Sequence, residues 1–553
     1  MSAHSTSFSS DSIPSFYSGR SILVTGASGF LGKILVEKLL YSLPDVRNVY
    51  LLIRPQNGMD ARQRVDKLLQ STIFNRIRTQ CPKRLDKLVA ISGNLMEHNI
   101  ALSDADRETL CENVAVVFHS AATVKFDEKL RLSVEMNVIG TQRLLALARD
   151  MKQLAAFVHT STAYCNCDRA RILERVYPPP MQPQKLMDAL DWMSDSMVDA
   201  ITPHAIGRRP NTYTLTKALA EFVIIEEAAE LPVVIIRPSI IGAVWREPVP
   251  GWADNLNGPT GMYAAVAKGI LTNMCGERNA RADFVPVDVV SNCMIAAAWN
   301  RANSQPDEIP VINCCSGRLN PTFWGYICDY VEVLYRHVPV DNALRFPTTK
   351  FHGEHFRAVK FLNNTVKHLM PAYIVDVFCR MTGKKPRMVR TYQKLMRAVE
   401  TLEFFTTREW DFQTDAMIEI INQMNAADKK EFCFDITKLQ WPQYHHISMI
   451  GVKKYILNDD FSNLTDAELH LNRLKWLSIS VNVASTYIAV KVLLRRWPTL
   501  RRWLVFLVAA LAHSSHIVRR PKLPLAVSQS ELEHSIVNLS NNNLMLAAAP
   551  NPA

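Results

Sequence analysis

The stretch SILVTGASGFLG, residues 21–32, joins a short apolar run to three glycines in the spacing G-x-x-G-x-x-G. Its first four residues are typical of a buried strand, and the continuation FLGKILVEKLL carries apolar residues at helical spacing. A second apolar run, NVYLLI at 48–53, follows that helix. This order predicts a strand–turn–helix–strand unit, the βαβ unit from which parallel sheets are built.

The three glycines of this unit are Gly26, Gly29 and Gly32. In such a turn they allow a tight bend, a close approach of the backbone to a pyrophosphate, and close packing of helix on strand. The helix N-terminus that follows favours an anion, because its first N–H groups are free and its dipole is positive there. A glycine triplet alone is weak evidence, but this one stands between a strand and a helix, the context that indicates dinucleotide binding.

The residue at the end of the second strand indicates which dinucleotide is bound. An NAD-binding protein typically places an acidic residue there for the ribose 2′-hydroxyl. This chain has LLIRPQNG, with Arg54 and no acid before Asp60. A guanidinium suits a 2′-phosphate through paired charged hydrogen bonds, so the sequence predicts NADPH. The alternative is that Arg54 only ends the strand.

The alternation of strands and helices continues along the chain. Apolar runs ending in small or polar residues are typical of parallel strands buried on both faces, whose C-terminal ends carry the ligand-binding groups. The runs are KLVAISGNL (87–95), VAVVFHSAA (114–122), AAFVHTSTAY (155–164) and LPVVIIRPSII (231–241). A helical pattern, EMNVIGTQRLLALARDM (135–151), lies between two of them. We therefore predict a doubly wound α/β domain of the Rossmann type over residues 18–300.

Composition excludes several classes of protein. The 553-residue chain is 48% hydrophobic and 21% charged, as folded proteins of more than one domain are. Its eleven cysteines include no Cys-x-x-Cys pair, which predicts reduced thiols and no metal site. The first 20 residues lack an apolar stretch of signal-peptide length, so we expect the folded body in the cytosol. The net charge of +11 comes without a motif that reads nucleic acid, and no nucleic-acid partner is expected.

The stretch NTYTLTKALAE places Tyr213 and Lys217 four residues apart on a predicted helix, with Asn211 as its cap. A free tyrosine has a pKa of roughly 10, and a neighbouring ammonium is expected to lower it. A hydroxyl from Ser161 or Thr162, at the end of the predicted strand HTSTAY, would hold the substrate oxygen. Such a set can stabilise and protonate the oxyanion that forms when hydride adds to a carbonyl.

Together these motifs resemble the extended short-chain dehydrogenases/reductases, and more narrowly the alcohol-forming fatty acyl-CoA reductases of animals. The resemblance covers nearly all of residues 13–520. The stretches that carry it are IPSFYSGRSILVTGASGFLGKILVEKLL, VVFHSAATVKFDEKL, FVHTSTAYCN, YTLTKALAE, IIRPSII, GWADNLNGPTGM, VPVDVVSN and LEFFTTREWDFQTD.

The resemblance implies a set of site residues. The catalytic residues would be Tyr213 and Lys217, with Thr162 preferred over Ser161 as the hydroxyl partner. The same two residues, Tyr213 and Lys217, would also contact the cofactor, together with Thr25, Gly26, Ser28, Gly29, Phe30, Leu31, Gly32, Arg54, Asn94, Leu95, Ser120, Ala121, Ala122, Pro238 and Ser239. Asn94 stands where the family usually has an aspartate near the adenine. Pro238 and Ser239 would lie beside the nicotinamide.

The resemblance also implies the reaction. Hydride adds to the thioester carbonyl of a long-chain fatty acyl-CoA, coenzyme A is expelled, and a second NADPH reduces the aldehyde to the alcohol at the same site. One alternative is another membrane-bound enzyme of the superfamily, such as a 3β-hydroxysteroid dehydrogenase, against which GWADNLNGPTGM argues. The other is a catalytically silent NADPH-binding membrane protein, against which the intact Tyr213 and Lys217 argue.

The C-terminal part contains two apolar segments. Residues 476–494 are about long enough to span a bilayer, although Asn482 and Lys491 weaken that interpretation. Residues 503–518 are shorter and follow an arginine cluster. If the first segment crossed the membrane, these arginines would lie on the side away from the cytosol, against the preference of basic residues for the cytosolic side. We therefore expect a re-entrant or interfacial attachment to a membrane, the alternative being two buried helices.

The predicted organisation is as follows. A polar segment at 1–17 precedes the α/β domain at 18–300, a substrate-side connection at 301–355, a helical domain at 356–470, a membrane-associated segment at 471–520, and a disordered tail at 521–553. Helical spacing in MVRTYQKLMRAVETLEFF and DAMIEIINQMN supports the helical domain. The resemblance implies attachment to a peroxisomal or endoplasmic reticulum membrane with the catalytic domain in the cytosol. The sequence does not predict an oligomeric state.

Overall fold

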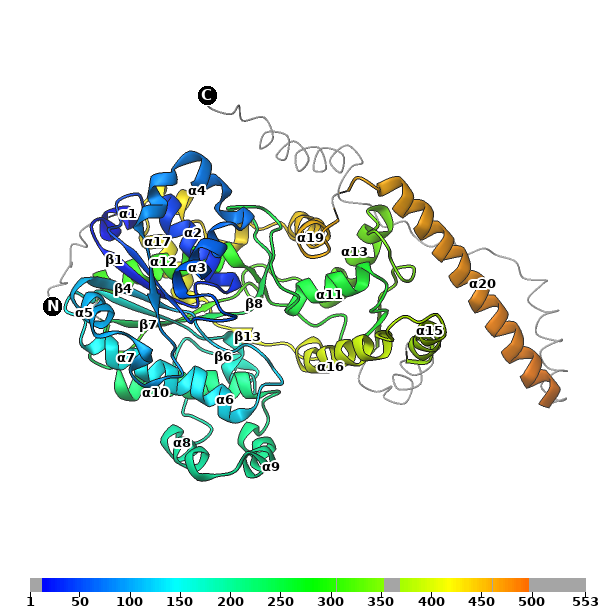
Figure 1. The fold of residues 1–553 in the computed structure, drawn as a ribbon, viewed down its shortest axis with the longest axis horizontal. Helices are drawn as coiled ribbons and strands as arrows, with labels where there is room; N and C mark the ends of the chain where they lie inside the picture. Colours follow the sequence, from blue (N-terminus) through cyan, green and yellow to red (C-terminus); the bar gives the residue numbers. More distant parts are fainter. Residues whose placement is uncertain (1–11, 305, 353–368, 460, 497–553) are drawn as a thin grey trace, which may run out of the picture. The chain divides into compact units, whose positions relative to one another are not determined.

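A computed structural model describes residues 12–304, 306–352, 369–459 and 461–496 (Figure 1). Its internal contacts divide the chain into two units, residues 1–474 and residues 475–553. The predicted tail at 521–553 and the second apolar segment at 503–518 lie outside the described residues.

The first unit is built on a seven-stranded sheet in which every neighbouring pair is parallel, in the order β11-β7-β5-β4-β1-β2-β3. The strands are β1 (Ser21–Thr25), β2 (Val49–Ile53), β3 (Leu88–Ser92), β4 (Val114–His119), β5 (Ala156–Thr160), β7 (Val233–Pro238) and β11 (Val311–Cys314). The six strands predicted from apolar runs are confirmed. The edge strand β11 was not predicted, because its four residues form too short a run to stand out.

Helices cover both faces of this sheet, which confirms the doubly wound α/β fold (Figure 1). α2 (Phe30–Ser42) and α12 (Val287–Asn303) pack together on one face. α7 (Gly140–Arg149) and α10 (Thr212–Glu227) pack together on the other. Every residue of β1, β2, β4, β5 and β7 is buried between these layers, as their continuous apolar runs require.

The strand order reverses beside β1. The chain runs outward from β1 through β2 to β3, then returns to place β4 on the other side of β1. The loops that leave β1 and β4 therefore diverge, and the crevice outside their C-terminal ends is where doubly wound sheets bind ligands. The glycine turn after β1 lies at this point.

The described chain contains further strands and helices besides the seven-stranded sheet and the four helices named above. The further strands are β6 (Arg171–Ile172), β8 (Ile240–Gly242), β9 (Asn273–Cys275), β10 (Phe284–Pro286), β12 (Lys350–His352) and β13 (Asp411–Phe412). The further helices of the N-terminal half are α1 (Ile13–Tyr17), α3 (Ala61–Leu69), α4 (Asn75–Gln80), α5 (Asp104–Asn113), α6 (Leu130–Val134), α8 (Pro183–Trp192), α9 (Asp195–Ile206) and α11 (Gly258–Ala267). Those that follow are α13 (Trp324–His337), α15 (Met370–Met381), α16 (Met388–Thr406), α17 (Asp415–Gln423), α18 (Ala426–Glu431), α19 (Trp441–Gly451) and α20 (Leu464–Arg496).

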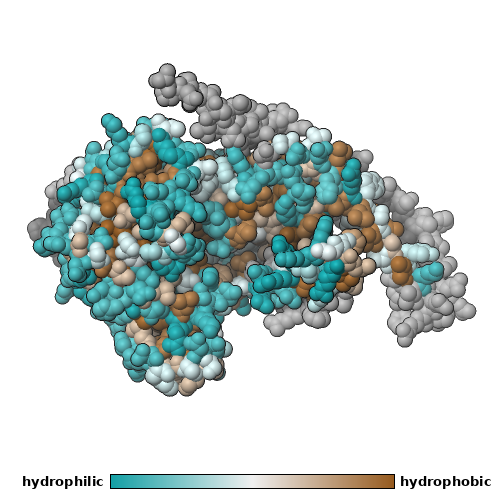
Figure 2. Space-filling view, in the orientation of Figure 1, coloured by the Kyte–Doolittle hydropathy of each residue, from teal (hydrophilic) through white to brown (hydrophobic). Residues whose placement is uncertain are grey.

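The C-terminal helices belong to the first unit as far as residue 474. α16 and α17 confirm the two helices predicted there, and β13 pairs in parallel with β6 of the α/β region. Hydrophobic residues are visible at the surface over the C-terminal helices, whereas the face over the sheet domain is mostly hydrophilic (Figure 2). The domain boundaries within this unit stay predictions, because contacts join the two regions.

One helix, α20, continues from the first unit into the second. It includes the apolar segment 476–494, in which Trp476, Leu477 and Tyr487 are exposed. Taken over the part of the chain that the structure describes, no helix is both long and apolar enough to cross a membrane.

Candidate active site

Helix α10 presents the tyrosine and the lysine at the C-terminal edge of the sheet. The side-chain oxygen of Asn211 accepts a hydrogen bond from the N–H of Thr214 at 2.9 Å, which confirms Asn211 as the cap of this helix. Lys217 is buried and its ammonium donates to the carbonyl of Thr160 at 2.7 Å, at the end of β5. Tyr213, one turn earlier, is partly exposed. The contact with β5 fixes the position of α10 against the sheet.

The two neighbouring hydroxyls after β5 point to different partners. The Thr162 side chain lies against the phenol of Tyr213, close enough to lower its pKa. The hydroxyl of Ser161 instead donates to the carboxylate of Glu221 at 2.5 Å, in the interior. Of the two residues that the sequence left as alternatives, Thr162 is therefore the one that faces the tyrosine.

Burial sets the protonation of the pair. It raises the pKa of Tyr213, an effect that Thr162 only partly offsets. The pKa of Tyr213 is therefore raised in this structure and not lowered as expected, because loss of water on burial is the largest effect on the phenol. Burial also lowers the pKa of Lys217 to about 8. At neutral pH Tyr213 holds its proton and can donate it.

The glycine turn after β1 leaves no room for side chains. Gly26 has a φ of +74°, and a Cβ there would lie 2.7 Å from the backbone nitrogen of Ala121. A Cβ at Gly32 would lie 2.2 Å from the carbonyl oxygen of Gly26. Gly29 is the N-cap of α2. Because glycine has no side chain to accept a hydrogen bond, the first N–H groups of α2 stay free. A narrow backbone cradle at a helix N-terminus fits the pyrophosphate of a dinucleotide.

Two arginines lie together beyond β2. Arg54 is exposed at the strand end, and Arg64 of α3 donates a hydrogen bond to the Arg54 carbonyl. Burial and the charge of Arg54 lower the pKa of Arg64. The first acid, Asp60, is occupied as the cap of α3, where its carboxylate accepts from the N–H of Gln63 at 2.8 Å. Sequence reasoning missed Arg64. The available signal was its position in the first turn of the helix that follows Arg54.

The other predicted cofactor residues stand at the C-terminal ends of β1, β3, β4 and β7. Thr25 bonds to His119 at 2.8 Å and accepts from the N–H of Ala121 at 3.2 Å. The Ser120 hydroxyl lies 2.9 Å from that of Thr160. Ser28 is exposed, Phe30, Leu31, Asn94 and Ala122 are partly exposed, and Leu95, Pro238 and Ser239 are buried. The side chain of Asn94 folds back on its own loop, bonding to the N–H of Met96 and to Glu97.

A buried ion pair joins α10 to β7. The guanidinium of Arg237, in β7, donates twice to the carboxylate of Glu221, at 2.7 and 2.6 Å, and both side chains are fully buried. Arg237 also donates to the carbonyls of Leu173 and Arg175. Because Ser161 bonds to the same carboxylate, Glu221 joins α10, β7 and the loop after β5. The sequence signal was the spacing Tyr213–Lys217–Glu221, three residues on one helix face.

Aromatic contacts connect the tyrosine to helix α16 through Phe126. The rings of Phe126 and Tyr213 are 6.1 Å apart, and Phe405, at the end of α16, is 5.8 Å from Phe126. Phe405 also packs on Tyr164, which contacts Trp410. The predicted helical domain thus supplies one apolar wall beside the catalytic residues.

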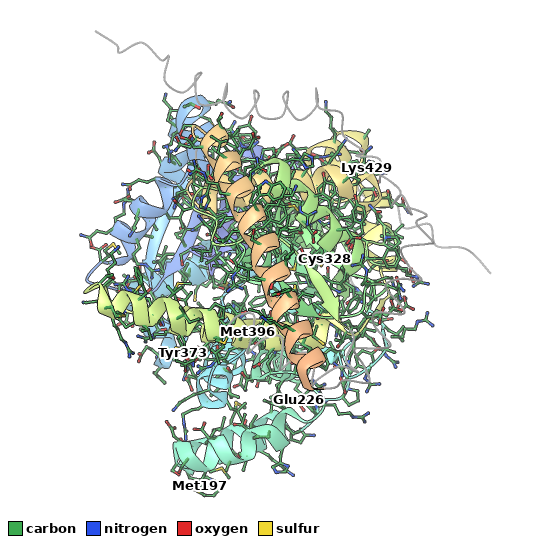
Figure 3. All side chains as sticks on the ribbon, turned by 90° about the vertical axis from the view of Figure 1, so that its right-hand side faces the viewer. Met197, Glu226, Cys328, Tyr373, Met396 and Lys429 are labelled. Carbon is green, nitrogen blue, oxygen red and sulfur yellow. The ribbon has the colours of Figure 1, made fainter. Side chains whose placement is uncertain are left out.

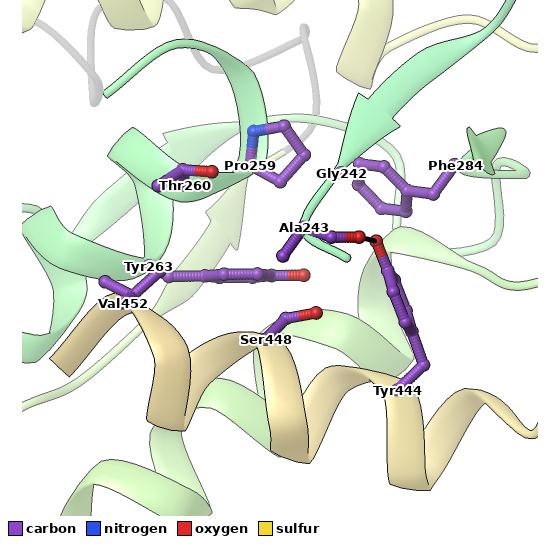
Figure 4. Close-up of a pocket in the computed structure, with 9 residues that line it drawn as sticks. All are labelled: Gly242, Ala243, Pro259, Thr260, Tyr263, Phe284, Tyr444, Ser448 and Val452. Carbon is purple, nitrogen blue, oxygen red and sulfur yellow. Dashed lines mark hydrogen bonds between the residues drawn. The ribbon is translucent and has the colours of Figure 1, made fainter. Parts of the chain in front are cut away.

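A second apolar pocket lies beyond Ser239, where β8 meets α11 and α19 (Figure 4). The hydroxyl of Tyr444 closes one side by donating to the carbonyl of Ala243 at 3.0 Å. A Cβ at Gly242 would lie 2.2 Å from that hydroxyl, so this position has room for glycine only. Its lining is Gly242, Ala243, Pro259, Thr260, Tyr263, Phe284, Tyr444, Ser448 and Val452.

Other potential reactive groups near the site are buried. His119 bonds to Thr25 and Thr141, and burial lowers its pKa to about 3, so its ring is neutral. Cys165 and Cys167 are buried, and burial raises the pKa of both thiols. Within the described ranges, no group of three histidine, cysteine or acidic residues is arranged to hold a metal ion.

Comparisons with known proteins place the chain among reductases. An NAD-binding family model described as "Male sterility protein" matches residues 24–294, and a second model with that description matches residues 367–459. Fatty acyl-CoA reductase 1 of Mus musculus is 44% identical over 90% of this chain and 96% of its own length. The human protein of that name is 43% identical over the same shares, and fatty acyl-CoA reductase 2 of Bos taurus is 41% identical, also over 90% and 96%.

Two solved structures share the fold at low sequence identity. The terminal R domain of the myxalamid biosynthetic pathway has a TM-score of 0.52 and 17% identity, covering 80% of this chain and 90% of that one. The reductase domain of a non-ribosomal peptide synthetase from Mycobacterium tuberculosis has a TM-score of 0.50 and 17% identity, covering 79% and 92%.

Proposed function

The chain belongs to the family of fatty acyl-CoA reductases, and from that premise we propose that it reduces long-chain fatty acyl-CoA to the primary alcohol with NADPH at the Tyr213 site. The observation that carries this assignment is the position of helix α10: its Lys217 donates to the Thr160 carbonyl, and its Tyr213 lies against Thr162 at the edge of the sheet that holds the glycine turn. The family favours this function over the steroid dehydrogenase alternative, and the intact Tyr213 and Lys217 favour an enzyme over a silent protein.

The residues of the chain supply the proton and the oxyanion contacts. NADPH, when bound, supplies the hydride that reduces the carbonyl carbon. The Tyr213 hydroxyl donates its proton to the carbonyl oxygen as negative charge develops there, and the Thr162 hydroxyl donates a second hydrogen bond. Lys217 stays positioned by the Thr160 carbonyl. Expulsion of coenzyme A leaves an aldehyde, on which Tyr213 acts a second time.

The reaction gives a direct test. We expect the purified protein to convert long-chain acyl-CoA and NADPH to fatty alcohol and free coenzyme A, with about two NADPH oxidised per alcohol, as the change in oxidation level from thioester to alcohol requires. Gas chromatography of the products and absorbance of NADPH measure both quantities. Accumulation of free aldehyde with one NADPH oxidised would contradict the second reduction.

The choice of NADPH rests on the two arginines beyond β2. Arg54 is exposed where a ribose 2′-substituent would lie, Arg64 stands beside it, and Asp60 is occupied as a helix cap. A carboxylate free at this place would repel a 2′-phosphate, whereas two guanidinium groups attract it.

Replacement of Arg54 by alanine should weaken the binding of NADPH and not that of NADH. Loss of its charged hydrogen bonds is expected to raise the KM for NADPH about 10- to 100-fold and to leave that for NADH nearly unchanged. Arg62→Ala is the matched control, since Arg62 is exposed on α3 and pairs with Asp66. Equal losses with both cofactors would show that Arg54 supports the strand end rather than the 2′-phosphate.

The membrane attachment and the organelle are further proposals. The segment 471–520 is proposed to hold the protein at the cytosolic face of a peroxisomal or endoplasmic reticulum membrane, where long-chain substrates partition. The exposed apolar side chains of Trp476, Leu477, Val483 and Ile488 on α20 support an interfacial or deeper contact with lipid. Carbonate extraction of cell membranes, with imaging of the tagged full chain, tests this assignment.

A further inference from the structure

A second apolar surface lies on α15, well before the segment 471–520 in the chain. Ile374, Phe378 and Met381 are 61%, 65% and 81% exposed. Their spacing of four and three residues places them on one helix face. The exposed apolar side chains of this helix are Met370, Tyr373, Ile374, Val375, Val377, Phe378 and Met381. Large apolar side chains gathered on an outer face mark an interaction surface.

The orientation of this helix is fixed by its other face. Ala372 and Asp376 are buried where α15 packs beside α16. The carboxylate of Asp376 accepts hydrogen bonds from the N–H groups of Arg387, Met388 and Val389, at 3.0, 2.8 and 2.9 Å. Tyr373 on α15 and Met396 on α16 mark the two helices in Figure 3. Because Asp376 caps α16, rotation of the apolar face inward would leave the start of that helix without its acceptor.

The charge around this surface is mainly positive, and the two acids of α16 itself, Glu400 and Glu403, lie in its last two turns. Residues 370–399 contain seven basic residues and a single acid, the buried Asp376. The basic residues are Arg380, Lys384, Lys385, Arg387, Arg390, Lys394 and Arg397, and all are exposed. None of them forms an ion pair with a carboxylate of the described residues. An apolar face with a cationic rim matches a bilayer interface, where acyl chains take up the apolar side chains and anionic headgroups take up the cations.

We propose that the α15–α16 hairpin is a docking surface for an anionic lipid bilayer, separate from the segment 471–520. This inference rests on the proposed function, since it names the surface through which the reductase meets the membrane that contains its substrate. α16 connects the surface to the site: it runs for 19 residues, about 28 Å, from the cationic rim to Phe405. Phe405 contacts Phe126, which contacts Tyr213. Docking would hold the apolar wall of the site at a fixed distance from the lipid.

Hydrogen exchange of the full chain tests the surface directly. Peptides covering 370–390 are expected to gain protection with vesicles of phosphatidylcholine and phosphatidylserine, and much less with phosphatidylcholine alone. Lys384→Glu/Lys385→Glu should abolish this gain and lower the partition coefficient on the order of 25-fold, since each cation near an anionic surface contributes about fivefold. Phe378→Ser should reduce the gain by removing apolar contact.

The control variant is Lys83→Glu/Lys430→Glu, which changes the net charge equally at two exposed lysines elsewhere. It should keep the protection of 370–390. Equal protection in all variants would overturn the proposal. Protection that appears without vesicles as the protein concentration rises would also overturn it, and would indicate that a second copy of the chain covers this surface. Reduction of detergent-solubilised acyl-CoA should stay within twofold in every variant, so a loss there would count against the proposed function and not against the docking surface.

Discussion

Tyr213→Phe should abolish nearly all alcohol formation. The substitution removes one oxygen, the group that we propose donates the proton to the carbonyl oxygen in both reductions. A positioned general acid contributes about 10²- to 10⁴-fold, so kcat is expected to fall by that range. The ring contact with Phe126 and the Asn211 cap of α10 stay in place, so the fold should be unchanged. Single-turnover assays with acyl-CoA, and separately with the fatty aldehyde, measure the loss in each step.

The matched control for this experiment is Tyr41→Phe. Tyr41 is outside the site and its hydroxyl donates to Gln80 at the surface. Activity should be within twofold of the unaltered protein there. If Tyr213→Phe retained the wild-type rate with either substrate, another group would have to donate the proton in that step.

Glu221→Ala should be strongly destabilising. It leaves the Arg237 guanidinium buried with no carboxylate and removes the acceptor of the Ser161 hydroxyl. Breaking one partner of a buried pair typically costs about 3–5 kcal/mol, because the remaining charge stays out of water without compensation. The free energy of unfolding from urea titration should fall by that amount. Activity should fall with it, since the carboxylate holds α10 against β7.

A control on the same helix separates this effect from a change in helix propensity. Glu226 is exposed near the C-terminal end of α10, and Glu226→Ala should change stability by no more than about 0.5 kcal/mol. If Glu221→Ala lowered the free energy of unfolding only as little as the control does, water or another acceptor would have to replace the carboxylate.

Much of the fold could be predicted because the sequence patterns that indicate it are local. The six strands of continuous apolar residues, the glycine turn after β1 and the cap at Asn211 each depend on a few adjacent residues and on backbone geometry. The missing edge strand β11 shows the limit: four residues do not form a distinctive pattern, and only the neighbouring β7 makes them a strand. The same limit applies to Arg64, whose place beside Arg54 depends on how α3 returns toward the strand end.

The sequence by itself determined the family and the doubly wound sheet, because these follow from spacing along the chain, and it supplied the proposal for the residues that carry the chemistry. Only the tertiary structure decided what surrounds them. It turned Ser161 toward Glu221 and Thr162 toward Tyr213, although the two are adjacent. It raised the pKa of Tyr213 where spacing to Lys217 predicted a lowered one, because burial depends on every element packed around the phenol. It also faced the apolar side of α15 outward, since Asp376 engages α16 on the inner side.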